Sequence, residues 1–425
     1  MQEDGADSIE VELELPYKNL YFRKSSDDLY SARFTHRILI EQQSDTDSDR
    51  YSTVHHVVTD DTVSTSDYEV TTSNEKFLFT DRYPLEPGFY RIRVMVTDNF
   101  TDKDFSRTTE IEVPDLQSKE MAFGQLRLLS LHEDRFRIVP GYHQEAGYDS
   151  LKSSIQLYVD SDTDQAEFRM RLLKFNYDDE PARPPHMQTP LQGSLFYRGI
   201  AYGEPDTVHT TTRELTSLQG ILDIDFELPR LTEGNYRIEV ESPDLREKGR
   251  EEDLYRARDF AIMPKGFPYI SDMEQMAEAI VYITREDEYE KIINSEDHQD
   301  LRYNFEAFFA GLYNNRNMAK NVIQQYFNRV EEANLMFSNH KPGWKTDPGM
   351  IYILFGPPDQ KERSINGMVW RYTRDSQMQA HSFVFERSRN VDRTYPTENY
   401  VLQRGRQFDR DYHRIMDRWR RGLVF

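Results

Sequence analysis

Leu85-Glu-Pro-Gly-Phe-Tyr-Arg-Ile-Arg-Val94 decides the fold of the N-terminal half, because it recurs 146 residues later as Leu231-Thr-Glu-Gly-Asn-Tyr-Arg-Ile-Glu-Val240. In each copy the glycine permits a tight turn, and the tyrosine two residues later begins a strand of alternating side chains. A tyrosine hydroxyl at such a place can bond back to the turn, as in the tyrosine corner of immunoglobulin-like sandwiches. We therefore expect structural roles for four residues: Gly88, Gly234, Tyr90 and Tyr236.

Further strand patterns precede the repeat in each copy. Residues 9–15 alternate strictly between apolar and acidic side chains, and the apolar pattern resumes at residues 34–40. This spacing predicts β-sandwiches of about a hundred residues each. The acidic run 45–49 matches 160–164 at an offset of 115, which leaves 31 extra residues in the second copy. We expect this insertion near residues 178–215.

Both acidic runs have the alternate spacing of a calcium-binding loop: Asp45, Asp47 and Asp49, then Asp160, Asp162 and Asp164. The second run lacks the glycine and the glutamate that an EF-hand needs at its sixth and twelfth positions, where Gln165 and Arg171 stand. We interpret the runs as exposed hairpin tips and assign no metal site, with weak calcium binding at Asp160, Asp162 and Asp164 as the alternative.

The C-terminal half changes pattern after Pro264-Lys-Gly-Phe-Pro268, which indicates a linker. Three apolar stripes at helical spacing follow, the first after a capping box at Ser271-x-x-Glu274. The apolar run Met350–Phe355 predicts a buried strand, ended by Gly356. A hairpin at Asn366-Gly367 then leads into a return strand that holds Trp370, to which we assign a structural role. Two short strands and an amphipathic helix complete the chain.

Together these patterns predict a multidomain, mainly β protein with an α+β part. It comprises two tandem immunoglobulin-like β-sandwiches, a helical segment and a small antiparallel α+β unit. The expected boundaries are 1–116, 117–264, 265–341 and 342–425.

Composition excludes several functions. The 425 residues carry 75 Asp and Glu against 53 Lys and Arg, a net charge of −22 that argues against a general nucleic-acid binder. The longest apolar run is about a third of the length that spans a bilayer, so we expect no transmembrane segment. There is no cysteine, which excludes disulfides, thiolate metal sites and cysteine nucleophiles. No phosphate-binding or metalloprotease motif occurs, and we expect no cofactor.

Positive charge is concentrated at the C-terminus. Residues 387–421 hold ten arginines, no lysine and five acids, a balance of +5. Two interpretations stay open: a solvated helix face, or a docking surface for a partner protein or for anionic lipid head groups. The docking interpretation rests on Arg414, Arg418, Arg420 and Arg421.

One motif is long and specific. Gly343-Trp-Lys-Thr-Asp347 is followed by Gly349-x-Ile-Tyr-Ile-x-Phe-Gly-Pro-Pro-Asp359, and it is preceded by Tyr326-Phe-x-Arg-Val-x-x-Ala-Asn-x-x-Phe337. These stretches resemble the signature and lead-in helix of the GWxTD-domain family. The resemblance implies an exported or envelope-associated protein of Gram-negative bacteria, with no established activity. One departure is Phe308-Phe-Ala-Gly311, where the family would place a tryptophan and an Arg-Asp-Pro-like turn.

The chain begins Met1-Gln-Glu-Asp4, without the features of a secretory signal. It is either cytoplasmic or a mature exported protein whose signal has been replaced by a start methionine. Following the resemblance, we expect the second, which is a periplasmic or outer-membrane-associated protein. A lipoprotein whose native N-terminus is absent from this sequence is compatible with that expectation.

The motif itself admits two interpretations. Trp344 can plug a junction between helices and sheet, with Thr346 and Asp347 capping the adjoining turn. Alternatively, Asp347 and Asp359 form a carboxylate pair for acid–base chemistry. We expect the structural role, and hence a non-enzymatic interaction or scaffold protein of the cell envelope that contacts other envelope proteins. Partner contacts are expected at Trp344, Pro357, Pro358 and the four arginines. The alternatives are a hydrolase using Asp347 and Asp359, and a glycan-binding protein.

Overall fold

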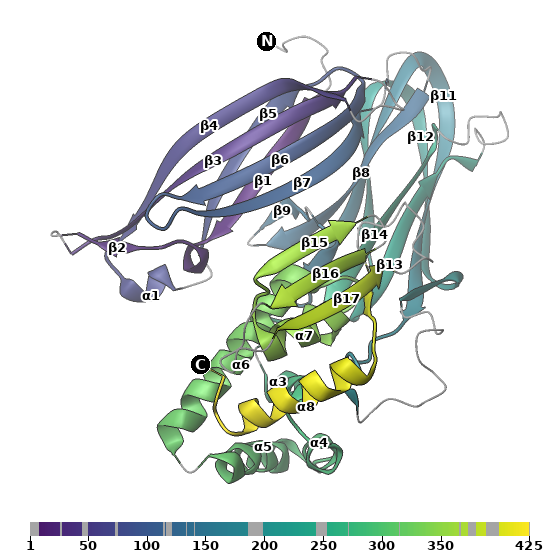
Figure 1. Ribbon diagram of the computed structural model, residues 1–425. Helices are drawn as coiled ribbons and strands as arrows, with labels where there is room; N and C mark the ends of the chain where they lie inside the picture. The colour runs from purple at the N-terminus through teal and green to yellow at the C-terminus, as the bar shows by residue number, and fades with distance from the viewer. Residues whose placement is uncertain are drawn as a thin grey trace. The chain divides into compact units, whose positions relative to one another are not determined.

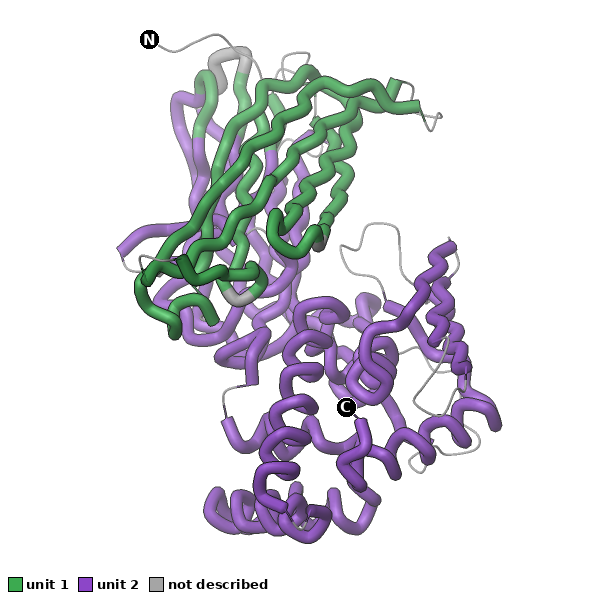
Figure 2. Tube along the Cα trace, turned by 60° about the vertical axis from the view of Figure 1, so that its left-hand side comes forward, with its two compact units in different colours: residues 1–124, 157–162, 219–222 green, residues 125–156, 163–218, 223–425 purple. Residues whose placement is uncertain are grey.

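The structure is a computed structural model, and its chain divides into two compact units (Figure 2). The first comprises residues 1–124, 157–162 and 219–222, and the second comprises the remainder. The structure describes residues 8–25, 28–44, 50–72, 75–113, 115, 121–132, 134–139, 141–185, 199–243, 253–270, 272–313, 315–364, 367–372, 380–387 and 399–424.

The first unit contains two sheets (Figure 1). Buried side chains from both sheets form common apolar clusters. In one sheet, β1 (Ser8–Pro16) pairs antiparallel with β5 (Lys76–Pro84). Val11 and Leu15 of β1 are buried while the glutamates between them are not, so the predicted alternation places one face against the core. The other sheet has the order β2 (Arg23–Lys24), β3 (Tyr30–Gln43), β6 (Gly88–Asp98), β7 (Lys103–Val113), with β4 (Tyr51–Thr65) paired to β3. A short helix, α1 (Tyr68–Thr71), follows β4.

A seven-stranded sheet, mostly in the second unit, contains the second copy of the repeat. Its order is β10 (His143–Glu145), β14 (Tyr255–Met263), β13 (Gly234–Glu241), β11 (Leu151–Tyr177), β8 (Met121–His132) and β9 (Arg135–Ile138), with β12 (Ile200–Leu228) paired to β11. Residues 200–215, expected in a loop-like insertion, therefore belong to a strand.

The two copies of the repeat have matching surroundings. Strand β6 lies between two antiparallel neighbours, β3 and β7, and β13 lies between β11 and β14 in the same way. Gly88 and Gly234 begin these strands with φ of 151° and 147°, which side-chain-bearing residues rarely adopt. The Tyr90 hydroxyl donates to the Glu86 carbonyl at 2.6 Å, and the Tyr236 hydroxyl donates to the Thr232 carbonyl at 2.8 Å. Each hydroxyl thus ties its strand to the turn before it.

The C-terminal part of the second unit combines helices with a four-stranded antiparallel sheet. The helices are α3 (Met273–Ala279), α4 (Glu286–Ile293), α5 (His298–Leu312), α6 (Arg316–Phe337), α7 (Asp347–Phe355) and α8 (Arg406–Arg420). The strands, in sheet order, are β15 (Gln360–Ser364), β16 (Gly367–Tyr372), β17 (His381–Arg387) and β18 (Tyr400–Leu402). One buried cluster draws side chains from α3, α5, α6, α7, α8 and this sheet, so the predicted helical segment and the unit after it share one core.

Several C-terminal predictions are confirmed: the hairpin before β16, the two following strands and the terminal helix. The N-cap of α3 is Asp272, one residue after the predicted cap at Ser271, because the side chain of Asp272 accepts the N–H of Gln275. Helix α4 was not predicted.

The predicted strand at Met350–Phe355 is wrong, because these residues form helix α7. All of its residues from Asp347 to Leu354 are buried, so its apolar run has no polar face. Without a polar face, periodicity cannot distinguish a buried helix from a buried strand. The deciding signal was Thr346-Asp347-Pro348, an N-cap threonine followed by an acid and a proline in the first turn.

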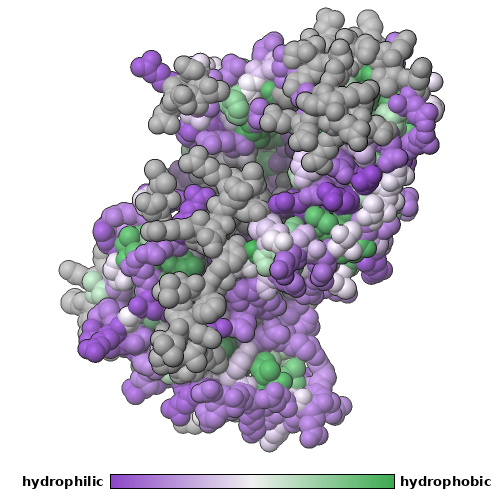
Figure 3. Space-filling model, turned by 90° about the vertical axis from the view of Figure 1, so that its right-hand side faces the viewer, coloured by the Kyte–Doolittle hydropathy of each residue, from purple (hydrophilic) through white to green (hydrophobic). Residues whose placement is uncertain are grey.

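The surface is consistent with the mean hydropathy of −0.80. On the face shown in Figure 3, hydrophilic side chains predominate and hydrophobic ones form small separate patches. None of the helices among the described residues is both long and apolar enough to cross a membrane.

Candidate functional site

The GWxTD pentapeptide joins α6 to α7 through a close backbone approach. Gly343 begins a short 3-10 turn, and a Cβ added to it would lie 1.9 Å from the carbonyl oxygen of Ala333 on α6. The Gly343 N–H donates to Ser338 Oγ at 2.7 Å, and the Trp344 N–H donates to Asn334 Oδ1 at 3.1 Å. Only glycine therefore fits the first position of the motif, and Asn334 of α6 and Ser338 directly after this helix supply the acceptors that hold the pentapeptide.

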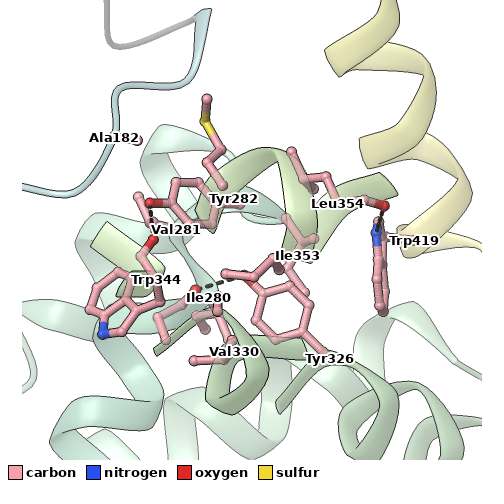
Figure 4. Packing of buried hydrophobic residues seen from close by; sticks show 14 of the residues in the cluster. Ala182, Ile280, Val281, Tyr282, Tyr326, Val330, Trp344, Ile353, Leu354 and Trp419 are labelled. Atoms are coloured by element: carbon pink, nitrogen blue, oxygen red, sulfur yellow. Dashed lines mark hydrogen bonds between the residues drawn. The ribbon is translucent and has the colours of Figure 1, made fainter. Parts of the chain in front are cut away.

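The indole of Trp344 is buried, with 4% of the residue exposed. Its ring lies edge-on to Tyr282 at 6.3 Å, and the Tyr282 hydroxyl donates to the Trp344 carbonyl at 2.7 Å (Figure 4). Burial raises the pKa of Tyr282 well above its ordinary value, so the hydroxyl stays a donor. Trp344 thus lies in the core and is not placed for the partner contact that we expect from the sequence.

Thr346 caps helix α7. Its Oγ1 accepts the N–H of Gly349 at 3.1 Å and donates to the Gly343 carbonyl at 2.7 Å. A Cβ on Gly349 would lie 1.9 Å from the Gly343 oxygen, so this glycine is also required by close packing. The threonine therefore satisfies a helix N-terminus that water does not reach.

Asp347 forms a buried ion pair. Its Oδ2 accepts the Leu402 N–H at 2.7 Å and Arg404 Nη1 at 2.9 Å, and its Oδ1 accepts Arg404 Nη2 at 2.5 Å. The carboxylate is 6% exposed and the guanidinium 17%. This bidentate pair ties the start of α7 to β18 and to the segment leading into α8.

The end of α7 is also bonded within the protein. Gly356 follows the helix with φ of 82°, beside the guanidinium of Arg329. Arg329 Nη1 donates to the carbonyls of Ile353 and Leu354 at 3.0 and 3.3 Å. Trp370, fully buried, lies in the adjacent sheet.

The turn after α7 is more open. Pro357 is exposed and Pro358 is partly buried. Of the residues expected to contact a partner in this region, these two prolines therefore reach the surface and Trp344 does not.

The segment before the motif contacts the seven-stranded sheet within the second unit. Asn235 of β13 donates to the His340 carbonyl at 2.8 Å, and His143 of β10 lies 2.7 Å from the Asn339 carbonyl. Lys341 pairs with Asp178 at 3.0 Å. Burial lowers the pKa of His340 to about 3, so its imidazole is neutral in the folded protein.

The two proposed catalytic aspartates are held at opposite ends of α7. The rise of a helix separates Asp347 from Phe355 by about 12 Å, and Asp359 lies four residues further on, exposed. With Asp347 bound to Arg404, the geometry does not support the pair as an acid–base site.

Most of the candidate arginines engage residues of their own chain. Arg420 donates to both carboxylate oxygens of Glu288 at 2.7 Å, and Arg418 donates to the Leu423 carbonyl. Arg421, the residue directly after α8, pairs with Asp417 of the helix and is 66% exposed. Arg414 lies 3.9 Å from Asp411. The positive charge of α8 is thus largely compensated inside the protein.

The candidate calcium runs lie outside the described side chains. Residues 45–49 are not described, and 160–164 fall within the bounds of β11 with undescribed side chains. In the part of the chain that is described, no three histidine, aspartate or glutamate side chains are grouped as metal ligands.

Comparison with known proteins agrees with the motif. A family model, GWxTD domain, matches residues 250–421. The protein carries a GWxTD domain. Among curated proteins, none matches the chain. A solved structure of Salmonella alpha-2-macroglobulin reacted with methylamine is similar over 61% of this chain and 17% of its own length, at 8% identity and a TM-score of 0.19. A similarity that low carries no argument, and this chain spans only about a sixth of that protein.

Sequence reasoning missed the partners of the GWxTD motif. Arg404 was counted as part of a charge run, and Asn334 as part of a lead-in helix. A lone acid beside a fully apolar run implies a buried cation, because an uncompensated buried charge is costly. Nothing in the sequence, however, shows which of the ten arginines supplies it.

Trp344→Ala should lower the free energy of unfolding of the GWxTD domain by about 3–5 kcal/mol, because it removes a buried indole and leaves a cavity. Urea unfolding followed by tryptophan fluorescence measures this, since Trp370 and Trp419 remain as reporters in the same domain. Tyr303→Ala, at a residue 69% exposed, is the control and should change stability by less than about 0.5 kcal/mol. An unchanged midpoint for Trp344→Ala would contradict the placement of the ring.

Asp347→Asn and Arg404→Gln should each lower the free energy of unfolding by about 3–5 kcal/mol, because each change breaks the buried pair and removes the partner of the remaining group. The double variant should cost less than the sum, with a coupling energy of about 1–3 kcal/mol in a double-mutant cycle. The exposed Arg302–Glu306 pair on α5 provides the comparison and should show coupling below about 0.5 kcal/mol. Strict additivity at Asp347 and Arg404 would argue against the ion pair.

Acid should lower the free energy of unfolding through the buried imidazole of His340, which lies in the segment before the motif. An unfolded histidine takes up a proton below about pH 6.5 while the buried one does not, so stability is fully present above pH 6.5 and falls as the pH drops toward 3. Between pH 7 and pH 5 the loss should be about 2 kcal/mol from this residue. His340→Gln should flatten the profile, measured by urea unfolding at each pH, whereas His413→Gln on the exposed side of α8 should not. Parallel profiles for the native protein and His340→Gln would refute this assignment.

Proposed function

We propose that this protein is a non-enzymatic interaction or scaffold protein of the bacterial cell envelope. In this proposal the paired sheets of the N-terminal half are immunoglobulin-like modules that space or present the GWxTD domain. The GWxTD domain is then the part that docks on other envelope proteins, in the periplasm or at the outer membrane. The exported address follows from the family resemblance.

One observation carries the non-enzymatic part of the proposal: the side-chain oxygens of Thr346 and Asp347 are bonded inside the fold, and the indole of Trp344 is buried. Thr346 caps α7, Asp347 is bound by Arg404 and the Leu402 N–H, and Trp344 is buried. A catalytic acid or base must be within hydrogen-bond reach of a substrate. These side chains instead stabilise a junction, which favours a protein that holds a shape.

The surface that remains for a partner lies near the ends of α7 and α8. Pro357 is exposed in the turn after α7, and Arg421 is exposed at the end of α8. A rigid proline turn loses little conformational freedom on binding, and an exposed guanidinium can bind a carboxylate with two parallel hydrogen bonds, so both are suited to contact with an acidic protein surface.

Affinity purification of the tagged full chain from fractionated cells of the native host tests this proposal. We expect the chain in the envelope fraction, with a partner recovered by mass spectrometry. Arg421→Glu should lower that recovery at least about fivefold, because it places a like charge at the contact. Arg316→Glu, the same charge reversal at the exposed start of α6, should leave recovery unchanged. Exclusive recovery from the cytoplasm, or equal recovery with both variants, would refute the proposal.

A further inference from the structure

Strand β7 forms one edge of the larger sheet in the first unit (Figure 1). Among the described residues it pairs only with β6, so its other edge presents backbone N–H and carbonyl groups to which no strand is bonded. All of its residues from Asp104 to Glu110 are exposed. Side chains of a strand alternate between the two faces of a sheet, so neither face of this stretch is covered.

One of these faces belongs to the core side of the sheet. Phe105 lies opposite Val96 and Thr109 lies opposite Ile92, and both β6 residues are buried. Directly paired residues project from the same face of a sheet. Phe105 is nevertheless 46% exposed. The core-facing side of β7 therefore continues the apolar face of β6 without a layer above it.

The opposing sheet is too narrow to cover β7. Its described strands are β1 and β5. The rings of Phe79 and Tyr83 on β5 lie 4.3 Å from His36 of β3 and 5.4 Å from His55 of β4, measured between ring centroids. With β5 over β3 and β4, β1 is the strand left for β6, and none of the described strands lies over β7.

The second copy of the repeat contains the equivalent strand. Ile92 and Ile238 correspond in the two copies, and they pair with Thr109 of β7 and Arg258 of β14. Strand β14 therefore corresponds to β7, at an offset of 149 residues. At that offset Leu254 corresponds to Phe105, and Leu254 is only 2% exposed. The place that is open in the first copy is closed in the second.

An extended stretch of the same chain lies along β14. This covering segment comprises residues 139 and 141–145. Arg258 donates to the carbonyls of Val139 and Gly141, and the Ala261 N–H donates to the Tyr142 carbonyl at 2.7 Å. Its last residues form β10, which adds to the edge of β14 as a parallel strand. The repeat thus shows that an extended segment fits beside this strand and over its core-facing side.

We propose that β7 binds an extended segment of a partner protein, in the place that the covering segment takes on β14. The segment pairs with the free edge of β7, as in recognition by strand addition. Arg107 lies between Phe105 and Thr109 on the core-facing side, is exposed and makes no ion pair among the described residues. A fitting segment therefore presents an acidic side chain to Arg107, with apolar side chains two residues before and after it.

A second copy of β7 does not have this chemistry. Its core-facing positions are Phe105, Arg107, Thr109, Ile111 and Val113, and none of them is acidic. Two such edges would therefore bring arginine and apolar side chains together without a carboxylate, which favours a different protein as the partner. The surface lies in the first unit, outside the GWxTD domain, and does not depend on the docking role proposed for that domain.

The probe is a synthetic peptide with blocked ends, Ser-Thr-Val-Thr-Glu-Thr-Val-Thr-Ser, whose valines and glutamate share one face when it is extended. Its sequence is symmetric about the glutamate, so it fits β7 in either direction. We expect saturable binding to the full chain by fluorescence anisotropy, and slower hydrogen exchange of the amides of residues 103–113. Replacing the glutamate by lysine should weaken binding at least about tenfold, because a like charge then meets Arg107. Proline at both threonines beside the glutamate should abolish binding, because proline cannot donate to a strand.

A charge exchange tests the position of the contact. Arg107→Glu should weaken binding of the glutamate peptide at least about tenfold and restore binding of the lysine peptide, because the two charges are exchanged. Arg37→Glu is the matched control, since Arg37 is an exposed arginine between buried neighbours on β3 and lies on the opposite face of the same sheet. It should alter neither affinity.

Binding of the lysine peptide by Arg107→Glu also shows that this variant is folded, and the comparison of the three peptides on the native protein needs no variant. No saturable binding, exchange protection confined to residues outside 103–113, or equal effects of Arg107→Glu and Arg37→Glu would each overturn the proposal. Self-association of the chain that Arg107→Glu abolishes would also overturn it, because a second copy would then be the occupant.

Discussion

Helix α7 is buried along nearly its whole length, and this constraint organises the GWxTD domain. A helix leaves unbonded N–H groups at its start and unbonded carbonyls at its end, which water normally satisfies. Because nearly all of α7 is buried, other residues of the protein supply partners at both of its ends. Thr346 serves the start, and Arg329 and the Trp419 indole N–H serve the carbonyls at the end. The elements of the domain that surround α7 therefore bury its side chains and bond to the backbone at its two ends.

The residues of the pentapeptide follow from that need. Gly343 allows the chain to approach α6, and Trp344 closes the core beside Tyr282. Thr346 caps the helix, and Asp347 adds a negative charge at its positive end while binding Arg404. Each of these residues has a structural role, which accounts for the specific sequence of the motif.

The other end of α7 has a different character. Around the motif the polar side chains of Thr346 and Asp347 are bonded within the protein, whereas Leu354 and Phe355 at the other end line a pocket of about 150 Å³. The two ends of the helix therefore differ in packing, because one is closed by the motif and the other borders a cavity.

The sequence alone determined the elements whose patterns are local. The repeated turns before Tyr90 and Tyr236, the hairpin before β16 and the amphipathic helices α5, α6 and α8 each have a period or turn chemistry that needs no distant partner. The periodicity of residues 347–355 does not show that they are helical, because an apolar run buried on all sides has no polar face; only the local signal at Thr346-Asp347-Pro348 indicates a helix start, and the tertiary structure shows the helix itself. It also decided that Arg404 pairs with Asp347 and that His381, Asp411 and Arg414 meet Arg329 at one pocket. Those contacts join residues up to 85 positions apart, and such distances are set by how the helices and the sheet pack together, which local spacing does not encode.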